Sequence, residues 1–143
     1  MQYLLSIILL SGLMAAAAHS QVAVITHLHT PTDTVSKTQL LDFYTGDVRA
    51  WESGRQVVVF DLKPKNETKK LFYQYLGKSP SRMKSIWMKR MLLGEGDPPE
   101  ACDTEEELLE KVANTPGAIG FVSKTKAATL DSVKTLVLIN KKD

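Results

Sequence analysis

Four short apolar runs, each about as long as a β-strand, constrain the fold of this chain more than any other feature. They are Val22–Leu28, Gln56–Asp61, Ala118–Val122 and Thr135–Asn140. Apolar runs that contain β-branched residues and little polar alternation are typical of strands covered on both faces of a sheet. Segments with apolar residues three to four positions apart separate the runs, as in amphipathic helices. We therefore predict an α/β fold, a three-layer α/β/α sandwich around a mixed sheet.

Capping residues mark where the intervening helices begin. Ser36 and Thr104 each precede a Gln or Glu by three positions, which is the capping-box pattern. Asn66 and Ser79 are suitable N-cap residues, and a proline follows Ser79 at the first helical position. A helix is expected after each of these four residues, and a short helical stretch is expected after Ser123. The predicted order is β-α-β-α-α-α-β-(α)-β, in one domain over residues 21–143.

The third predicted helix and the segment after it carry three further predictions. Met83, Met88 and Met91 are interpreted as core-filling side chains rather than as a metal-relay motif. The Gly- and Pro-rich segment Glu95–Asp103 is interpreted as a connection between helices. It contains Cys102, and a single cysteine excludes an internal disulfide and a multi-cysteine metal site. Cys102 is therefore expected to be a buried hydrophobe, with pairing between two chains as the alternative.

The first 20 residues have the features of a secretory signal peptide. They contain no Lys, Arg, Asp or Glu, and Leu4–Leu10 is an apolar run that Leu13 and Met14 continue. This run is too short for a membrane-spanning helix, which needs about 20 apolar residues. Ala18-x-Ser20 fits the small-residue cleavage pattern, although no basic residue precedes the run. We predict a cleaved signal peptide over residues 1–20 and a periplasmic protein, with an uncleaved anchor as the alternative.

Charge and motifs exclude several function classes. Lys and Arg number 18 against 16 Asp and Glu, and these charges are interspersed, so no basic stripe marks a nucleic-acid partner. No nucleophile elbow, phosphate-binding loop, dinucleotide fingerprint or C-x-x-C motif is present. We expect a non-enzymatic protein without a cofactor, unless catalytic residues distant in sequence meet in the fold. His27 and His29 are interpreted as surface residues, and a metal site that adds Asp33 is the alternative.

The strongest chemical pattern lies at Lys63–Lys70, where a predicted strand leads into a predicted helix. Exposed backbone N–H groups, the helix dipole, polar side chains and four lysines come together there. Those groups are suited to holding an oxyanion, and ligands of open α/β sheets bind just beyond the carboxyl ends of strands. The candidate ligand-binding residues are Asn66, Thr68 and Lys69. The alternative is a capped helix with solvated lysines.

Three stretches together resemble the periplasmic phosphate-binding proteins of ABC transport systems. Leu40–Gly54 (LLDFYTGDVRAWESG) is similar to their "IFxG…W…G" segment. Val57–Phe72 (VVVFDLKPKNETKKLF) is similar to their strand and phosphate loop, usually R-S-D-G-S-G-T. Asn114–Val122 (NTPGAIGFV) resembles their "TPGAIGYV" element and is the most specific of the three. The resemblance implies one lobe of a two-lobe clamp, here a periplasmic-binding-protein-like (PBP-like) domain standing alone.

The phosphate loop is where this sequence departs from the family pattern. Leu62 stands at the arginine position, Pro64 at the aspartate position, Asn66 at the serine position and Glu67 at a glycine position. Only Thr68 is kept. The lost arginine removes the bidentate partner that phosphate prefers, and the Glu67 carboxylate repels an anion. The resemblance thus implies a solute-binding-protein-like domain that binds phosphate or another small anion weakly, in phosphate uptake or sensing. A periplasmic protein-interaction module that has lost its ligand, partnering a membrane sensor or transporter protein, is the alternative.

Overall fold

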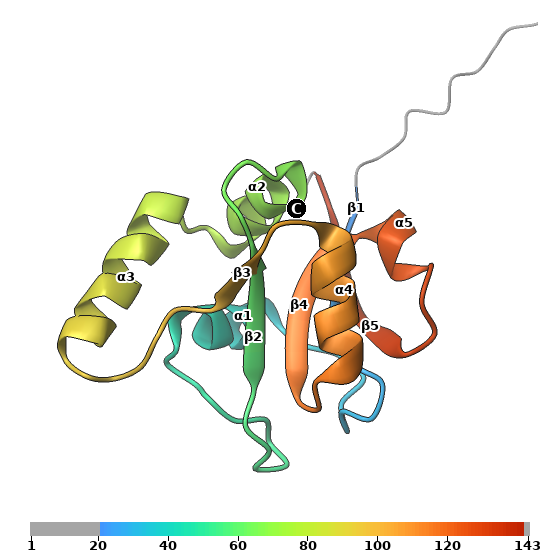
Figure 1. Ribbon diagram of the computed structural model, residues 1–143, viewed down its shortest axis with the longest axis horizontal. Helices are drawn as coiled ribbons and strands as arrows, with labels where there is room; N and C mark the ends of the chain where they lie inside the picture. Colours follow the sequence, from blue (N-terminus) through green and yellow to red (C-terminus); the bar gives the residue numbers. More distant parts are fainter. Residues whose placement is uncertain (1–20, 142–143) are drawn as a thin grey trace, which may run out of the picture.

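The computed structural model describes residues 21–141, which form one five-stranded sheet with helices around it (Figure 1). The strands are β1 (Gln21–His27), β2 (Val58–Leu62), β3 (Glu100–Cys102), β4 (Ala118–Ser123) and β5 (Val133–Asn140). The helices are α1 (Lys37–Thr45), α2 (Glu67–Leu76), α3 (Pro80–Leu92), α4 (Glu105–Asn114) and α5 (Lys124–Ala127). The predicted signal peptide lies outside the described residues.

The sheet is mixed, as predicted. Its strand order is β3-β2-β4-β1-β5. β2 runs parallel to both β3 and β4, whereas β1 runs antiparallel to β4 and β5. The carboxyl end of β2 and the amino end of β1 therefore lie at the same end of the sheet. The opposite end carries the loop after β1 and the turn before β4.

Two adjacent residues of β4 show why helices cover both faces of the sheet. Phe121 stacks on Phe72 of α2 with ring centroids 4.0 Å apart, and Tyr44 of α1 lies 4.9 Å from Phe72. On the other face, a Cβ atom at Gly120 would stand 2.7 Å from the Leu108 side chain of α4, so glycine allows close packing there. Successive strand residues point to opposite faces. The three-layer sandwich is thus confirmed, with α4 on one face and α1 and α2 on the other (Figure 1).

Most of the predicted helix starts are confirmed by the capping geometry. Ser36 makes the full reciprocal capping box with Gln39. Asn66 and Ser79 cap α2 and α3 through their side-chain oxygens. Thr104 also caps its helix, but the Glu107 carboxylate accepts a hydrogen bond from the backbone N–H of Asp103 rather than from that of Thr104.

The prediction that Glu95–Asp103 contains no strand is wrong. Glu100–Cys102 forms β3, which pairs with β2 at the edge of the sheet, for example Leu62 with Cys102. Only Cys102 of the three residues is buried, so the strand is too short and too exposed to leave an apolar pattern in the sequence. Cys102 is fully buried, as expected for a cysteine used as a small hydrophobe.

The prediction that all three methionines of α3 are core residues is wrong for two of them. Met83 is buried, but Met88 and Met91 are 49% and 45% exposed. The helix is anchored on one side by its polar side chains: Trp87 donates from Nε1 to the Tyr44 carbonyl (2.9 Å) and Arg90 donates from Nε to the Thr45 carbonyl (2.7 Å). Because α3 stands at the β3 edge of the sheet, no other element within residues 21–141 covers its far side (Figure 1).

Strand ends differ from the prediction by a few residues. Val57 donates its N–H to the Arg49 carbonyl (3.0 Å), so the chain joins the sheet only at Val58. Within residues 21–141, no helix combines the length and apolar character that crossing a membrane requires.

Candidate anion site at the start of helix α2

Helix α2 begins just beyond the carboxyl end of β2, at the place where an anion site is predicted. The chain turns between them, and Asn66 donates its N–H to the Lys63 carbonyl (3.1 Å). The Asn66 side-chain oxygen accepts from the Lys69 N–H (3.1 Å), which caps the helix. The side-chain oxygen of Asn66 is thus used, whereas its side-chain NH₂ has no partner among residues 21–141.

Thr68 brings three elements together at this helix start. Its buried hydroxyl donates to Oε1 of Glu105, the first residue of α4, over 3.2 Å. The same oxygen accepts the backbone N–H of Ser123, where β4 ends. Two donors from separate elements therefore converge on one carboxylate oxygen beside the α2 N-terminus, where the helix dipole favours negative charge.

Lys69 is directed to another partner. Its ammonium lies 3.3 Å from Oδ2 of Asp61 in β2, and both side chains are about nine-tenths buried. The Tyr73 hydroxyl donates to the same Asp61 oxygen, and the Leu62 N–H donates to the other one (2.7 Å). Burial, reinforced by Asp61, raises the pKa of Tyr73 far above its ordinary value, so its hydroxyl stays a donor. The Asp61 carboxylate is thereby fully satisfied inside the protein.

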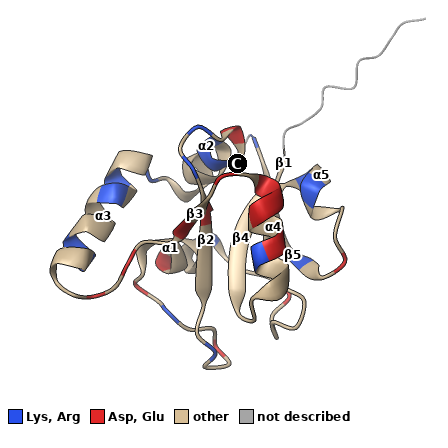
Figure 2. Ribbon diagram, in the orientation of Figure 1, with Lys and Arg blue, Asp and Glu red and all other residues tan. Residues whose placement is uncertain are grey.

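The remaining lysines form a cationic surface beside the helix start. Lys63 pairs with Asp103, and that hydrogen bond raises the pKa of the Lys63 ammonium. Lys65 and Lys70 are exposed and make no ion pair with the part of the chain that the structure describes. Figure 2 shows basic segments around the start of α2 and an acidic first turn of α4 at the same end of the sheet. The local field is therefore mixed rather than strongly positive.

Sequence reasoning placed Asn66 and Thr68 at one helix start but missed their neighbours. Glu105 lies in the acidic first turn of α4, which complements the helix dipole, and its carboxylate also reaches across to Thr68. Asp61 left a signal, because an acidic residue inside an apolar run needs a buried partner. Ser123 left none, since it acts through its backbone N–H.

The alternative metal site is not assembled. His27 and His29 lie close, with ring centroids 5.5 Å apart, and the His29 N–H donates to Nδ1 of His27 (3.2 Å). Partial burial and the neighbouring His29 lower the pKa of His27. Asp33 instead pairs with Lys134 (3.3 Å). Residues 21–141 contain no group of three or more His, Cys, Asp or Glu that could hold a metal ion.

Comparison with solved structures shows which known fold the chain has. A proposed phosphate ABC transporter substrate-binding protein from Clostridium perfringens, solved with bound phosphate, matches with a TM-score of 0.66 at 20% identity. An ABC-type phosphate transport receptor from Vibrio cholerae matches with a TM-score of 0.66 at 16% identity. PstS from Borrelia burgdorferi matches with a TM-score of 0.63 at 11% identity. The chain has a PBP-like fold.

The share of each chain that is aligned shows how much of those proteins this chain matches. The matches cover 82% of this chain but only 44%, 45% and 47% of those three proteins. The PBP-like chain thus spans about half the length of the structures it resembles, the size of a single lobe. No protein-family model and no curated protein matches its sequence.

Proposed function

We propose that this chain is an exported, non-enzymatic, solute-binding-protein-like domain that binds phosphate or another small oxyanion weakly at the start of α2. The observation that carries the proposal is the convergence of the Thr68 hydroxyl and the Ser123 N–H on one carboxylate oxygen. Donors that hold a carboxylate oxygen can hold a phosphate oxygen in the same way. The PBP-like fold supports a solute-binding role, and bound phosphate in one similar structure supports the choice of anion.

In this proposal an incoming anion replaces the Glu105 carboxylate. It would accept from Thr68, from the free side-chain NH₂ of Asn66 and from N–H groups of the first turn of α2. Lys69 would contribute positive charge from its buried position beside Asp61. Binding is weak for two reasons: the anion competes with an internal carboxylate, and a single lobe cannot desolvate it from both sides.

The predicted signal peptide supports a periplasmic location for this activity. There the domain would serve phosphate uptake or sensing with a membrane transporter or sensor protein as its partner. Neither a nucleic acid nor a cofactor has a role in the proposal. The dispersed charges of the sequence, which lacks a dinucleotide fingerprint and a phosphate-binding loop motif, support this choice.

An NMR titration of the purified protein with inorganic phosphate tests the proposal. We expect shifts of the Asn66, Thr68 and Lys69 amide signals with millimolar affinity. The variant Thr68→Val keeps the side-chain shape but removes the hydroxyl, and it should weaken binding. Thr38→Val on the exposed face of α1 is the matched control. Absence of binding by the unmodified protein at millimolar phosphate would reject the anion-binding role.

A second candidate function is protein interaction through α3. Leu92 and Leu93 are 83% and 60% exposed, and Met88 and Met91 continue this apolar surface. The helix carries Arg82, Lys84, Lys89 and Arg90 but no Asp or Glu. An exposed apolar patch with a basic border fits a protein partner that has an apolar surface with an acidic border.

This second function has its own test. The double variant Leu92→Ser/Leu93→Ser should abolish retention of a periplasmic partner on the immobilised protein, without changing phosphate binding. Leu138→Ser removes an exposed leucine of β5, at the opposite edge of the sheet from β3, and is the control. Equal retention by both variants would reject α3 as the docking surface.

A further inference from the structure

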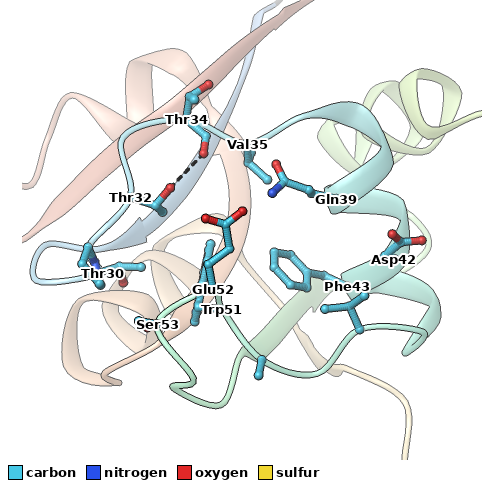
Figure 3. A pocket seen from close by; sticks show the side chains of 13 residues that line it. Thr30, Thr32, Thr34, Val35, Gln39, Asp42, Phe43, Trp51, Glu52 and Ser53 are labelled. Atoms are coloured by element: carbon cyan, nitrogen blue, oxygen red, sulfur yellow. Dashed lines mark hydrogen bonds between the residues drawn. The ribbon is translucent and has the colours of Figure 1, made fainter.

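The structure contains a pocket at the end of the sheet opposite the α2 start. It has a volume of about 360 Å³ and lies between the loop after β1, helix α1 and the segment 48–53 (Figure 3). β1 ends at this side of the sheet, as the pairing of Thr26 with Ile119 shows, whereas α2 follows the far end of β2. We infer that this pocket binds a small organic cation that carries an ammonium group. The inference is independent of the proposed anion site.

The inner wall of the pocket is apolar and fixed. Val35, Phe43 and Trp51 are 5%, 5% and 7% exposed. The two aromatic rings meet edge to face, with centroids 4.9 Å apart and an interplanar angle of 61°. Trp51 is held from behind, because its Nε1 donates to the Gly117 carbonyl over 2.9 Å. A ligand would therefore meet a rigid aromatic surface, which attracts cations through the negative ring face.

The polar lining carries negative charge and no positive charge. Asp42 and Glu52 both contribute to the pocket, and no Lys, Arg or His lines it. Within residues 21–141, neither carboxylate makes a hydrogen bond or an ion pair. Figure 3 shows the Glu52 side chain directed toward Gln39 and Thr32, with Asp42 at the far end beside Phe43. The two carboxylates give the pocket negative charge without a counter-charge from its lining residues, which favours a bound cation.

The remaining polar groups are largely engaged within the protein. The Thr32 hydroxyl donates to the Thr34 carbonyl (3.1 Å), and the Thr30 and Thr26 hydroxyls are hydrogen-bonded (2.9 Å). The Gln39 side-chain oxygen accepts from the Ser36 N–H (2.9 Å), which leaves the Gln39 NH₂ as a free donor. A sugar needs several donors and acceptors together. The pocket offers mainly carboxylates and an aromatic wall, so it fits a cation better than a polyol, and it repels an anion.

Choline and neohexyl alcohol provide a matched pair of probes, because they have the same shape and the alcohol has carbon in place of nitrogen. We expect choline to shift the Trp51 indole and Thr32 amide signals in NMR spectra of the purified protein, and neohexyl alcohol to leave them unchanged. Glu52→Gln and Asp42→Asn keep the side-chain size and remove the charge. Each should weaken choline binding about tenfold. Glu110→Gln, an exposed residue of α4, should leave it unchanged.

Several results would overturn the inference. The first is that neohexyl alcohol or glucose shifts the same signals as choline. The second is that neither charge-removing variant alters the affinity for choline. The third is that choline at about 10 mM shifts no signals. A titration with phosphate tests the proposed anion site separately from this pocket. Phosphate should move signals at the α2 start and leave the Trp51 indole unmoved, so failure of either site leaves the other one testable.

Discussion

The Thr68 hydroxyl donates to Oε1 of Glu105 over 3.2 Å and thereby joins the first turns of α2 and α4. Each first turn attracts negative charge through its free N–H groups, and this one carboxylate lies between the two. The same oxygen also accepts the Ser123 N–H. An acidic side chain of the protein thus occupies the position in which a bound anion would be most favourable.

Removing that carboxylate should improve anion binding. In Glu105→Gln the side chain still accepts from Thr68, but the negative charge that repels phosphate is gone. We expect phosphate affinity to rise roughly tenfold, which corresponds to about 1.4 kcal/mol. Calorimetric titration of both proteins measures the change.

Glu106→Gln provides the matched control, because it removes the same charge one residue away. The Glu106 carboxylate is exposed and pairs with Lys126, a contact that lowers its pKa. Its removal should change phosphate affinity by less than about twofold, because exposed charges are screened. Equal gains in the two variants would show that overall charge, rather than the Thr68 contact, limits binding.

Breaking the buried ion pair should destabilise the fold. Asp61→Ala leaves the Lys69 ammonium buried without its partner, and it also removes the acceptor for the Tyr73 hydroxyl. The expected loss is about 3–5 kcal/mol in the free energy of unfolding, measured with urea. Asp103→Ala breaks an exposed pair with Lys63 and should leave the free energy of unfolding nearly unchanged. Comparable losses in both variants would contradict a stabilising role for the buried pair.

Gly117 should tolerate no side chain. Its φ is +80°, and a Cβ atom there would stand 2.5 Å from the Gln56 carbonyl oxygen. We expect Gly117→Ala to lower the free energy of unfolding by roughly 2–4 kcal/mol. Gly54 also has positive φ (+88°), but a Cβ atom there meets nothing within 4 Å. Gly54→Ala therefore isolates the backbone cost, and an equal loss in the two variants would show that the contact with Gln56 is unimportant.

Stability should fall at alkaline pH partly because of Cys102. Burial of the thiol, with Glu107 nearby, raises its pKa above its ordinary value, to about 11. Below pH 9 the thiol is protonated in both the folded and the unfolded states, so it does not make stability depend on pH. Between about pH 9 and 11 the unfolded state releases the proton first, and stability declines.

Urea unfolding across this pH range should show a shallower decline in Cys102→Ala than in the unmodified protein. Tyr44 and Tyr73 add a decline of their own above pH 10, which both proteins share, because their folded pKa values are also raised. A disulfide exchange reagent at pH 8 should label Cys102 only after unfolding. Rapid labelling of the folded protein would contradict the burial of the thiol.

The elements of this fold that could be predicted are those with strong local signals. Asn66 and Ser36 mark helix starts through their own side chains, and the apolar runs mark the long strands. β3 could not be predicted, because Glu100 and Ala101 are exposed and the strand depends on pairing with β2. Hydrogen bonding to a neighbouring strand leaves no periodic pattern when only one side chain is buried.

Some residues of the candidate site could likewise be predicted from the sequence, and others could not. The positions of Asn66 and Thr68 follow from the strand and helix pattern around them. The contact with Glu105 joins residues 37 positions apart and depends on how α2 and α4 pack. The exposed far side of α3 was missed for a related reason: helical spacing of Met88 and Met91 shows which residues share a face, but not whether anything covers it.

The sheet order has a consequence for how the protein is made. Strand β1 lies between β4 and β5, so Val22 finds its hydrogen-bonding partners only near Ser123 and Ile139. A ribosome releases those segments long after β1, and until then β1 has no partner strand in the sheet. Assembly is consequently a late step that joins distant parts of the chain, and such topologies fold slowly. The sheet can therefore close around β1 only when β4 and β5 are both available.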